Sequence, residues 1–144
     1  MIFPFSKNLT DENSTKEIAK IFSSVIRKGD IIAINGLLGS GKTTFVKYVC
    51  ENYKIYNVSS PSFAIVNVYI GSCKIYHFDF YRIKKIVELY DIGFEDYLND
   101  DSSIIFIEWA DLFNEILPKR LYEVKLELLE NNQRIINIKR FGYA

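Results

Sequence analysis

One short segment constrains the fold of this 144-residue chain more than any other: residues 36–43, which read GLLGSGKT. They satisfy the pattern GxxxxGK[ST] at every fixed position. The apolar run IIAI at residues 31–34 precedes them, and apolar residues at helical spacing follow them over 42–53. A buried strand, a glycine-rich turn and an amphipathic helix in this order predict a loop that cradles phosphate groups.

The chemistry of such a loop assigns roles to its residues. Glycines let the backbone approach a ligand closely, and amides at a helix N-terminus carry partial positive charge. Lys42 is expected to reach the β- and γ-phosphates of ATP, Thr43 to place its hydroxyl on Mg²⁺, and Thr44 to contact the α-phosphate. The amides expected to hold the phosphates belong to Leu38, Gly39, Ser40, Gly41, Lys42 and Thr43. The complete pattern and its context disfavour the alternative, a structural turn with an exposed lysine.

The remaining segments predict an α/β fold, a three-layer sandwich of the P-loop NTPase type with a central, mostly parallel sheet. Ser14 and Glu17 have capping-box spacing, so one helix is expected over 14–29. A second helix is expected over 42–53, and broken helical turns over 83–98. The expected strands cover residues 31–34, 62–69, 74–80, 103–107, 122–129 and 134–141. The last two are expected to form a closing hairpin.

Composition and charge narrow the classes of function. Lysines and arginines number 18, as do aspartates and glutamates, so no net charge draws the chain to nucleic acid. No apolar stretch approaches the about 20 residues of a membrane span, and the N-terminus lacks a signal-peptide pattern. Cys50 and Cys73 lack CxxC spacing, which favours reduced core residues in a cytoplasmic protein. The length and the absence of linkers predict a single domain over residues 1–144.

Two acids end apolar runs downstream of the loop. Asp79 ends IYHFD and Glu108 ends IIFIE. Either one can lie at the carboxyl edge of the sheet, hold the Mg²⁺ shell and polarise an attacking water, or simply end a strand in solvent. The polar loop at residues 59–63, SSPSF, could fold over a γ-phosphate or form a plain turn. His77 could act in catalysis but is interpreted as a packed or half-exposed strand residue, and Trp109 could stack on a base but is interpreted as a core residue.

Several segments, in order, resemble one known family. Residues 36–45, GLLGSGKTTF, resemble its GDLGAGKTTF, residues 76–82, YHFDFYR, resemble its YHFDLYR, and residues 107–109 match its IEW. The resemblance also covers SPSF at residues 60–63, GFEDYL at 93–98 and ILP at 116–118, and runs from about residue 10 to the C-terminus. The family is TsaE, also called YjeE, the small bacterial ATPases needed for threonylcarbamoyladenosine in tRNA.

The resemblance implies a Mg²⁺-dependent ATPase that acts on the TsaD–TsaB threonylcarbamoyl-transferase complex, and on tRNA only indirectly. The modified base would be the adenosine next to the anticodon, and hydrolysis would reset the complex between turnovers. The resemblance also implies that Thr43 and Glu108 ligate Mg²⁺. Asp79 would hold the outer shell of that metal or the attacking water, and Ser62 would sense the γ-phosphate. With Lys42, the two acids form the expected catalytic set.

The sequence departs from the family pattern at a few positions. Leu37 stands in place of Asp, which removes a charge but no phosphate donor. Ser62 stands in place of Thr and keeps the hydroxyl, whereas Ala64 stands in place of another Thr and loses it. The candidates to flank the adenine are Thr10, Asp11 and Arg134.

Other functions could use the same cradle. A small-molecule kinase usually carries an arginine-rich lid and a substrate pocket, whereas the arginines here are scattered. A regulatory GTPase carries a guanine-reading NKxD sequence, which does not occur in this chain. A nucleotide-dependent binding module with negligible turnover is the non-enzymatic alternative.

Overall fold

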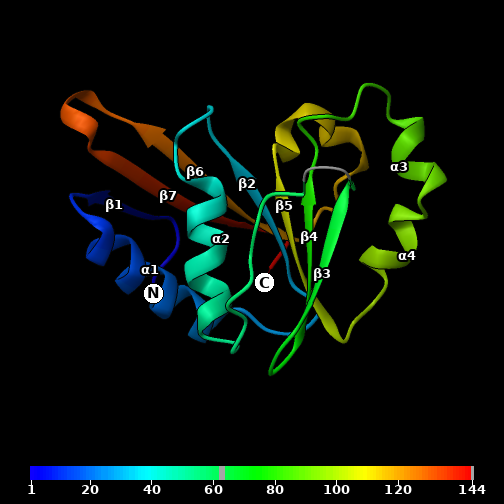
Figure 1. The fold of residues 1–144 in the computed structure, drawn as a ribbon, viewed down its shortest axis with the longest axis horizontal. Helices are drawn as coiled ribbons and strands as arrows, with labels where there is room; N and C mark the ends of the chain where they lie inside the picture. The colour runs from blue at the N-terminus through cyan, green and yellow to red at the C-terminus, as the bar shows by residue number, and fades with distance from the viewer. Residues whose placement is uncertain (62–63, 144) are drawn as a thin grey trace.

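The computed structural model describes residues 1–61 and 64–143, and within them seven strands form one sheet in the order β1-β7-β6-β2-β5-β4-β3 (Figure 1). The strands are β1 (Phe5–Leu9), β2 (Ile31–Asn35), β3 (Val66–Ile70), β4 (Lys74–Asp79), β5 (Ser103–Glu108), β6 (Leu121–Leu128) and β7 (Arg134–Phe141). The helices are α1 (Glu12–Val25), α2 (Lys42–Glu51), α3 (Val87–Asp91) and α4 (Phe94–Leu98), with 3₁₀ segments η1 (Ala110–Ile116) and η2 (Glu130–Asn132).

The sheet is parallel at its centre and antiparallel at both edges. Strand β2 pairs in parallel with both β5 and β6, and β4 pairs in parallel with β5. The outer strands β3, β7 and β1 pair antiparallel with their neighbours. The α/β fold class is therefore confirmed, with a mixed rather than uniformly parallel sheet.

The two faces of the sheet carry separate cores, which makes the fold three-layered. In β2, Ile32 and Ile34 join the cluster under α1 and α2, whereas Ile31 and Ala33 join the cluster that includes residues of α3, α4 and η1. Figure 1 shows α1 beside α2, away from α3 and α4. Because successive residues of a strand face opposite sides, burial on both faces explains the unbroken apolar run.

The predicted start of the first helix was wrong by two residues. Helix α1 begins at Glu12, and its capping box joins Asp11 to Ser14 rather than Ser14 to Glu17. The Asp11 carboxylate accepts a hydrogen bond from the Ser14 amide at 2.8 Å, and the Ser14 hydroxyl accepts one from the Asp11 amide at 3.2 Å. Asp and Ser are both favoured at the N-cap position, and Asp11 takes it here because its backbone has the extended conformation that an N-cap requires.

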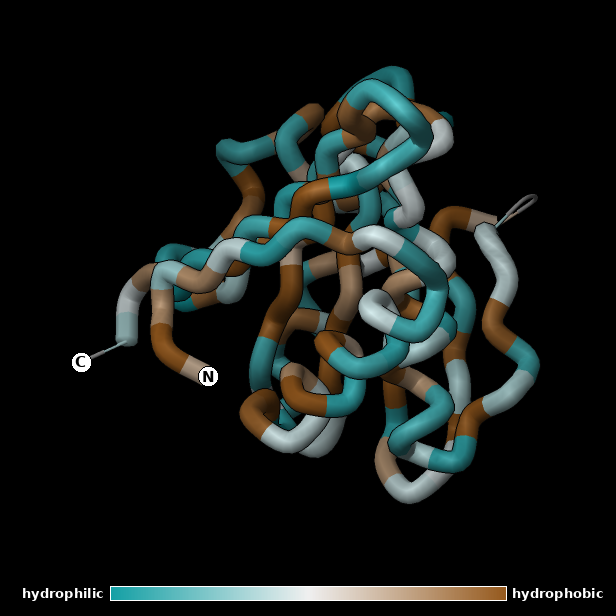
Figure 2. Tube along the Cα trace, turned by 90° about the vertical axis from the view of Figure 1, so that its left-hand side faces the viewer, coloured by the Kyte–Doolittle hydropathy of each residue, from teal (hydrophilic) through white to brown (hydrophobic). Residues whose placement is uncertain are grey.

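Strand β1 was not predicted. Of its five residues only Leu9 is buried, so the segment lacks the apolar pattern of a strand. It adds to the sheet by antiparallel pairing with β7, beside which it lies in Figure 1. Figure 2 shows the two ends of the chain on the same side of the molecule. The other predicted strands occur within a few residues of their expected bounds. The start of the strand expected over 62–69 lies partly outside the described residues, and β3 begins at Val66.

Two further predictions, the break in the helical turns over 83–98 and the burial of both cysteines, are confirmed. Gly93, at a φ of 73°, separates α3 from α4 in the broken helical segment. Cys50 and Cys73 are free and buried, and burial raises the pKa of the Cys50 thiol to about 12. In the described part of the chain, no helix is both long and apolar enough to cross a bilayer.

Phe22 tests the core beneath α1. Its ring is fully buried and packs against Phe45 and Tyr122 at centroid distances of 5.9 and 5.5 Å. We expect Phe22→Ala to lower the free energy of unfolding by about 3–5 kcal/mol, because it leaves a cavity. The neighbouring Ile21 is 40% exposed, so Ile21→Ala should cost about 1 kcal/mol or less. Urea unfolding measures both, and equal losses would contradict this packing.

Candidate functional site

The glycine-rich loop joins the end of β2 to the start of α2. A Cβ on Gly36 would lie 2.5 Å from both the Leu126 carbonyl oxygen and the Ser40 hydroxyl, so only glycine fits there. Gly41 caps α2 in the left-handed conformation, at a φ of 101°. Among the described residues no side chain caps this helix, so its first amides remain available to an anion.

Lys42 lies inside this loop and is only 6% exposed. Its ammonium donates to the carbonyl oxygens of Gly36 at 2.6 Å and Leu37 at 2.9 Å, and lies 4.2 Å from the centre of the Trp109 ring. Burial lowers the pKa of Lys42, while the carboxylates of Glu108 and Asp79 oppose that shift. Trp109 is half-buried and packs against one core of the sheet, in line with its interpretation, and it also covers the lysine.

Glu108 reaches the loop because β5 runs parallel to β2, with Glu108 in register with Ile34. The Thr43 hydroxyl lies 2.8 and 2.9 Å from the two carboxylate oxygens of Glu108, which is 3% exposed. The same hydroxyl lies 2.9 Å from that of Ser60. The structure therefore joins two of the predicted metal ligands directly, and brings the loop around Ser60 to them.

Asp79 ends the next parallel strand, in register with Glu108. Its carboxylate accepts a hydrogen bond from the backbone amide of Tyr81 at 3.0 Å, which holds the side chain close to the end of its own strand. Burial raises the pKa of Asp79, and the negative charge of Glu108 adds to that shift. Both acids thus lie beside Lys42, but only Glu108 touches Thr43 in the described hydrogen-bond network.

His77 is the residue whose importance the sequence did not reveal. It is fully buried, and its Nε2 is hydrogen-bonded to Oε2 of Glu108. Its Nδ1 lies 3.0 Å from the Tyr69 hydroxyl, whose oxygen accepts a bond from the Ser59 amide. The Tyr69 hydroxyl also donates to the Ser59 carbonyl oxygen at 3.0 Å. Because a carboxylate oxygen accepts hydrogen bonds, the Nε2 atom of His77 carries a proton and donates it to Glu108. The one available signal was the spacing from Asp79, because residues two apart share a strand face.

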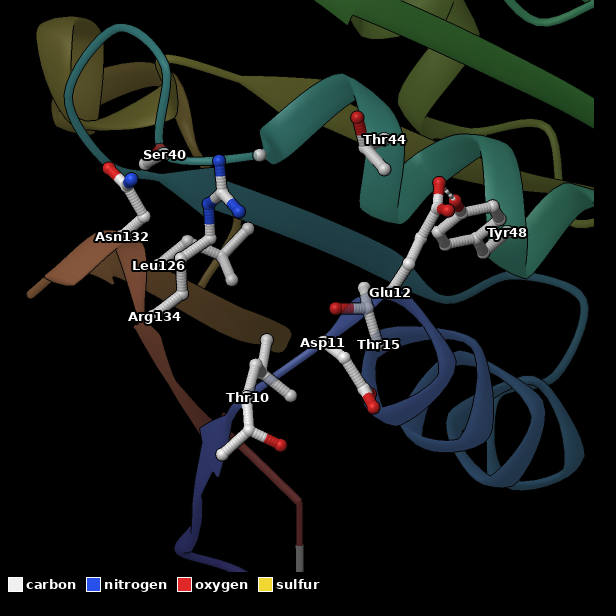
Figure 3. Close-up of a pocket in the computed structure, with 12 residues that line it drawn as sticks. Thr10, Asp11, Glu12, Thr15, Ser40, Thr44, Tyr48, Leu126, Asn132 and Arg134 are labelled. Atoms are coloured by element: carbon white, nitrogen blue, oxygen red, sulfur yellow. Dashed lines mark hydrogen bonds between the residues drawn. The ribbon is translucent and has the colours of Figure 1, made fainter.

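A cavity of about 340 Å³ opens beside the loop, between α1, α2 and β7 (Figure 3). Its lining includes all three residues expected to flank the adenine, together with parts of the loop and α2: Thr10, Asp11, Arg134, Ser40, Gly41, Thr44 and Tyr48. Arg134 donates to the Gly39 carbonyl oxygen at 3.2 Å and also lines a second cavity, of about 520 Å³. That second cavity contains Leu38, Lys42, Thr43, Asp79, Glu108 and Trp109.

The predicted site residues, which come from distant parts of the sequence, therefore line two adjoining cavities. Ser62 lies outside the described residues. In the described part of the chain, no three His, Cys, Asp or Glu side chains are grouped as a metal cage. The Thr43 hydroxyl and Glu108 carboxylate still fit Mg²⁺, which commonly takes one or two carboxylates and fills its other positions with phosphate and water oxygens.

Asp79 predicts a pH dependence of stability. Because its folded-state pKa is raised above 3.8, protonation favours the folded state, and this contribution is lost as pH rises through the folded-state pKa. We therefore expect Asp79→Asn, which removes the half-buried charge, to be more stable than wild type at neutral pH. The difference should shrink as the pH falls below 3.8. Urea unfolding across this range measures it, and a variant less stable at neutral pH would contradict the prediction.

Comparison with known proteins identifies the family of this chain. The family model described as "Threonylcarbamoyl adenosine biosynthesis protein TsaE" matches residues 9–136. A relative from Rickettsia typhi, named tRNA threonylcarbamoyladenosine biosynthesis protein TsaE, is 39% identical over 138 residues, covering 94% of each chain. The protein of that name from Bacillus subtilis is 34% identical over 130 residues, covering 89% of this chain and 80% of its own. A crystal structure of Bacillus subtilis YdiB matches with a TM-score of 0.79 and 26% identity, covering 99% of this chain and 88% of that one. The chain belongs to the TsaE family, whose role lies in tRNA threonylcarbamoyladenosine biosynthesis.

Proposed function

We propose that this chain is a Mg²⁺-dependent ATPase that assists threonylcarbamoyladenosine formation. One observation carries the proposal: the Thr43 hydroxyl lies within 2.9 Å of both Glu108 carboxylate oxygens, at the N-terminus of α2 and beside Lys42. Phosphate-binding amides, a lysine and a metal-competent hydroxyl–carboxylate pair are the parts that ATP hydrolysis requires.

Each group has a distinct task in this proposal. The α2 amides bind the phosphates, and Lys42 exchanges its bonds to the Gly36 and Leu37 carbonyls for phosphate oxygens. Thr43 and Glu108 hold Mg²⁺, which supplies positive charge against the phosphate oxygens when bound. Asp79, with its raised pKa, orients or deprotonates the attacking water at the second acidic strand end.

The proposed partner is the TsaD–TsaB transferase complex, in the cytoplasm. Membership in a family named for tRNA threonylcarbamoyladenosine biosynthesis supports a place in that process, and the two free cysteines fit a reducing compartment. ATP turnover measured with and without purified TsaD–TsaB, while tRNA modification is scored, tests this partnership. An unchanged turnover and an unchanged yield of modified tRNA would overturn it.

Lys42→Ala tests the nucleotide site. We expect ATP affinity to fall by at least about tenfold and hydrolysis to be lost, because a charge-assisted contact to phosphate contributes about 1.5–3 kcal/mol. Lys47→Ala is the matched control, because Lys47 is an exposed lysine on the same helix. Calorimetric ATP binding and phosphate release measure both effects. Unchanged turnover in Lys42→Ala would refute the site, and γ-phosphate transfer to a small acceptor would favour a kinase instead.

His77 is a positioning residue for Glu108 in this proposal. A glutamine amide can replace the Nε2–H donor of histidine, whereas the shorter asparagine cannot reach Glu108. We therefore expect His77→Asn to lower kcat about tenfold or more with little change in ATP affinity, and His77→Gln to restore much of kcat. Thermal unfolding checks that both variants fold. Equal kcat losses in two folded variants would mean that His77 only fills space.

A further inference from the structure

A second cleft lies at the opposite end of the sheet from the glycine-rich loop. It has a volume of about 510 Å³ and is lined at the exit of α1, the start of β6 and the end of β7. Asp30, which precedes β2, lies in this cleft, whereas the glycine-rich loop follows Asn35 at the other end of that strand. A five-residue strand separates the two sites by roughly 17 Å.

Four cations line the cleft: Arg27, Lys28, Arg120 and Arg140. They include three of the five arginines of the chain, which are widely separated in sequence. All four residues are exposed, and the ion pairs found among the described residues involve none of them. A chain with no net charge thus concentrates positive charge in one concave place.

Among the described residues that line the cleft, Asp30 is the single acid, and it does not neutralise the four cationic side chains. Asp30 is 7% exposed. Its two carboxylate oxygens accept hydrogen bonds from the Tyr143 hydroxyl and from the backbone amide of Arg27, each at 2.7 Å. Asp30 therefore serves to fix the wall of the cleft, and its charge offsets only part of the positive charge around it.

Aromatic rings hold two of the arginines in place. The Arg120 guanidinium lies 4.4 Å from the centre of the Tyr143 ring, and that of Arg140 lies 5.3 Å from Tyr143 and 5.1 Å from Phe3. A guanidinium held against a ring keeps N–H groups at its edge for bidentate contacts to phosphate. Tyrosine and arginine side chains packed together in this way are typical of surfaces that bind RNA backbones and unpaired bases.

We propose that this cleft binds the phosphate backbone of tRNA directly. The proposal goes beyond the ATPase function, which uses the other end of the sheet, and differs from the expectation that tRNA is reached only through protein partners. It does not depend on ATP hydrolysis, because the cleft shares no lining residue with the phosphate site.

Binding of a fluorescently labelled, unmodified tRNA transcript, measured by anisotropy without nucleotide over a range of salt concentrations, tests the proposal. We expect Arg120→Gln/Arg140→Gln to weaken tRNA binding at least about tenfold. The magnitude of the slope of log K against log [salt] should fall by about 1–2. Lys84→Gln/Lys85→Gln is the matched control, because it removes the same charge from two exposed lysines outside the cleft. This control and Lys42→Ala should both bind tRNA as wild type does.

Several results would overturn the proposal. They are the absence of tRNA binding by the wild-type chain at low salt, and equal losses in the arginine and lysine double variants. A third such result is arginine-dependent binding to anionic phosphatidylglycerol vesicles that is stronger than tRNA binding and displaces the tRNA. That result would assign the cleft to a lipid surface. If thermal unfolding shows that the arginine variant does not fold, Arg27→Gln/Lys28→Gln takes its place and must meet the same tenfold criterion.

Discussion

The parallel pairing of β2 with β5 is the constraint on which the site depends. Their register places Glu108 beside Ile34, one residue before the end of β2, so its carboxylate meets the Thr43 hydroxyl as the chain enters α2. Pairing of β4 with β5 then aligns Asp79 with Glu108. In a parallel sheet all carboxyl ends lie at one edge, and a shift of one residue would turn these acids to the opposite face.

Burial of the charged groups at that edge carries a desolvation cost, which neighbouring groups must offset. Lys42 and Glu108 are nearly inaccessible to water, and burial moves the pKa values of Lys42 and Asp79 toward their neutral forms. The opposite charges of the lysine and the acids reduce this cost, as do the hydrogen bonds from Thr43 and His77 to Glu108. In the proposed function Lys42 exchanges its bonds to the Gly36 and Leu37 carbonyls for phosphate oxygens, while His77 keeps Glu108 oriented, and such preset orientation suits electrostatic catalysis.

Hydrogen bonds also connect the site to the loop around Ser59 and Ser60. Glu108 reaches Ser60 through the Thr43 hydroxyl, and reaches Ser59 through His77 and Tyr69. Both routes are short, and the second runs through the buried side chains of His77 and Tyr69 before it reaches the exposed Ser59, so the position of this loop and the orientation of the carboxylate are physically linked. The opposite end of the sheet has a different chemistry, with exposed cations over aromatic rings, and the parallel strands separate the two.

The sequence by itself determined the parts whose information is local. A contiguous glycine pattern between an apolar run and a helix predicted the phosphate loop, and apolar runs ending in Asp79 and Glu108 predicted two strands with acids at their ends. Strand β1 could not be predicted, because its exposed edge carries no apolar pattern and β7 supplies its hydrogen bonds. Only the tertiary structure decided that Glu108 contacts Thr43, that His77 supports Glu108, and that Arg27, Arg120 and Arg140 share a cleft. The physical reason is that strand order and register, which no short segment encodes, set the distances between residues far apart in the chain.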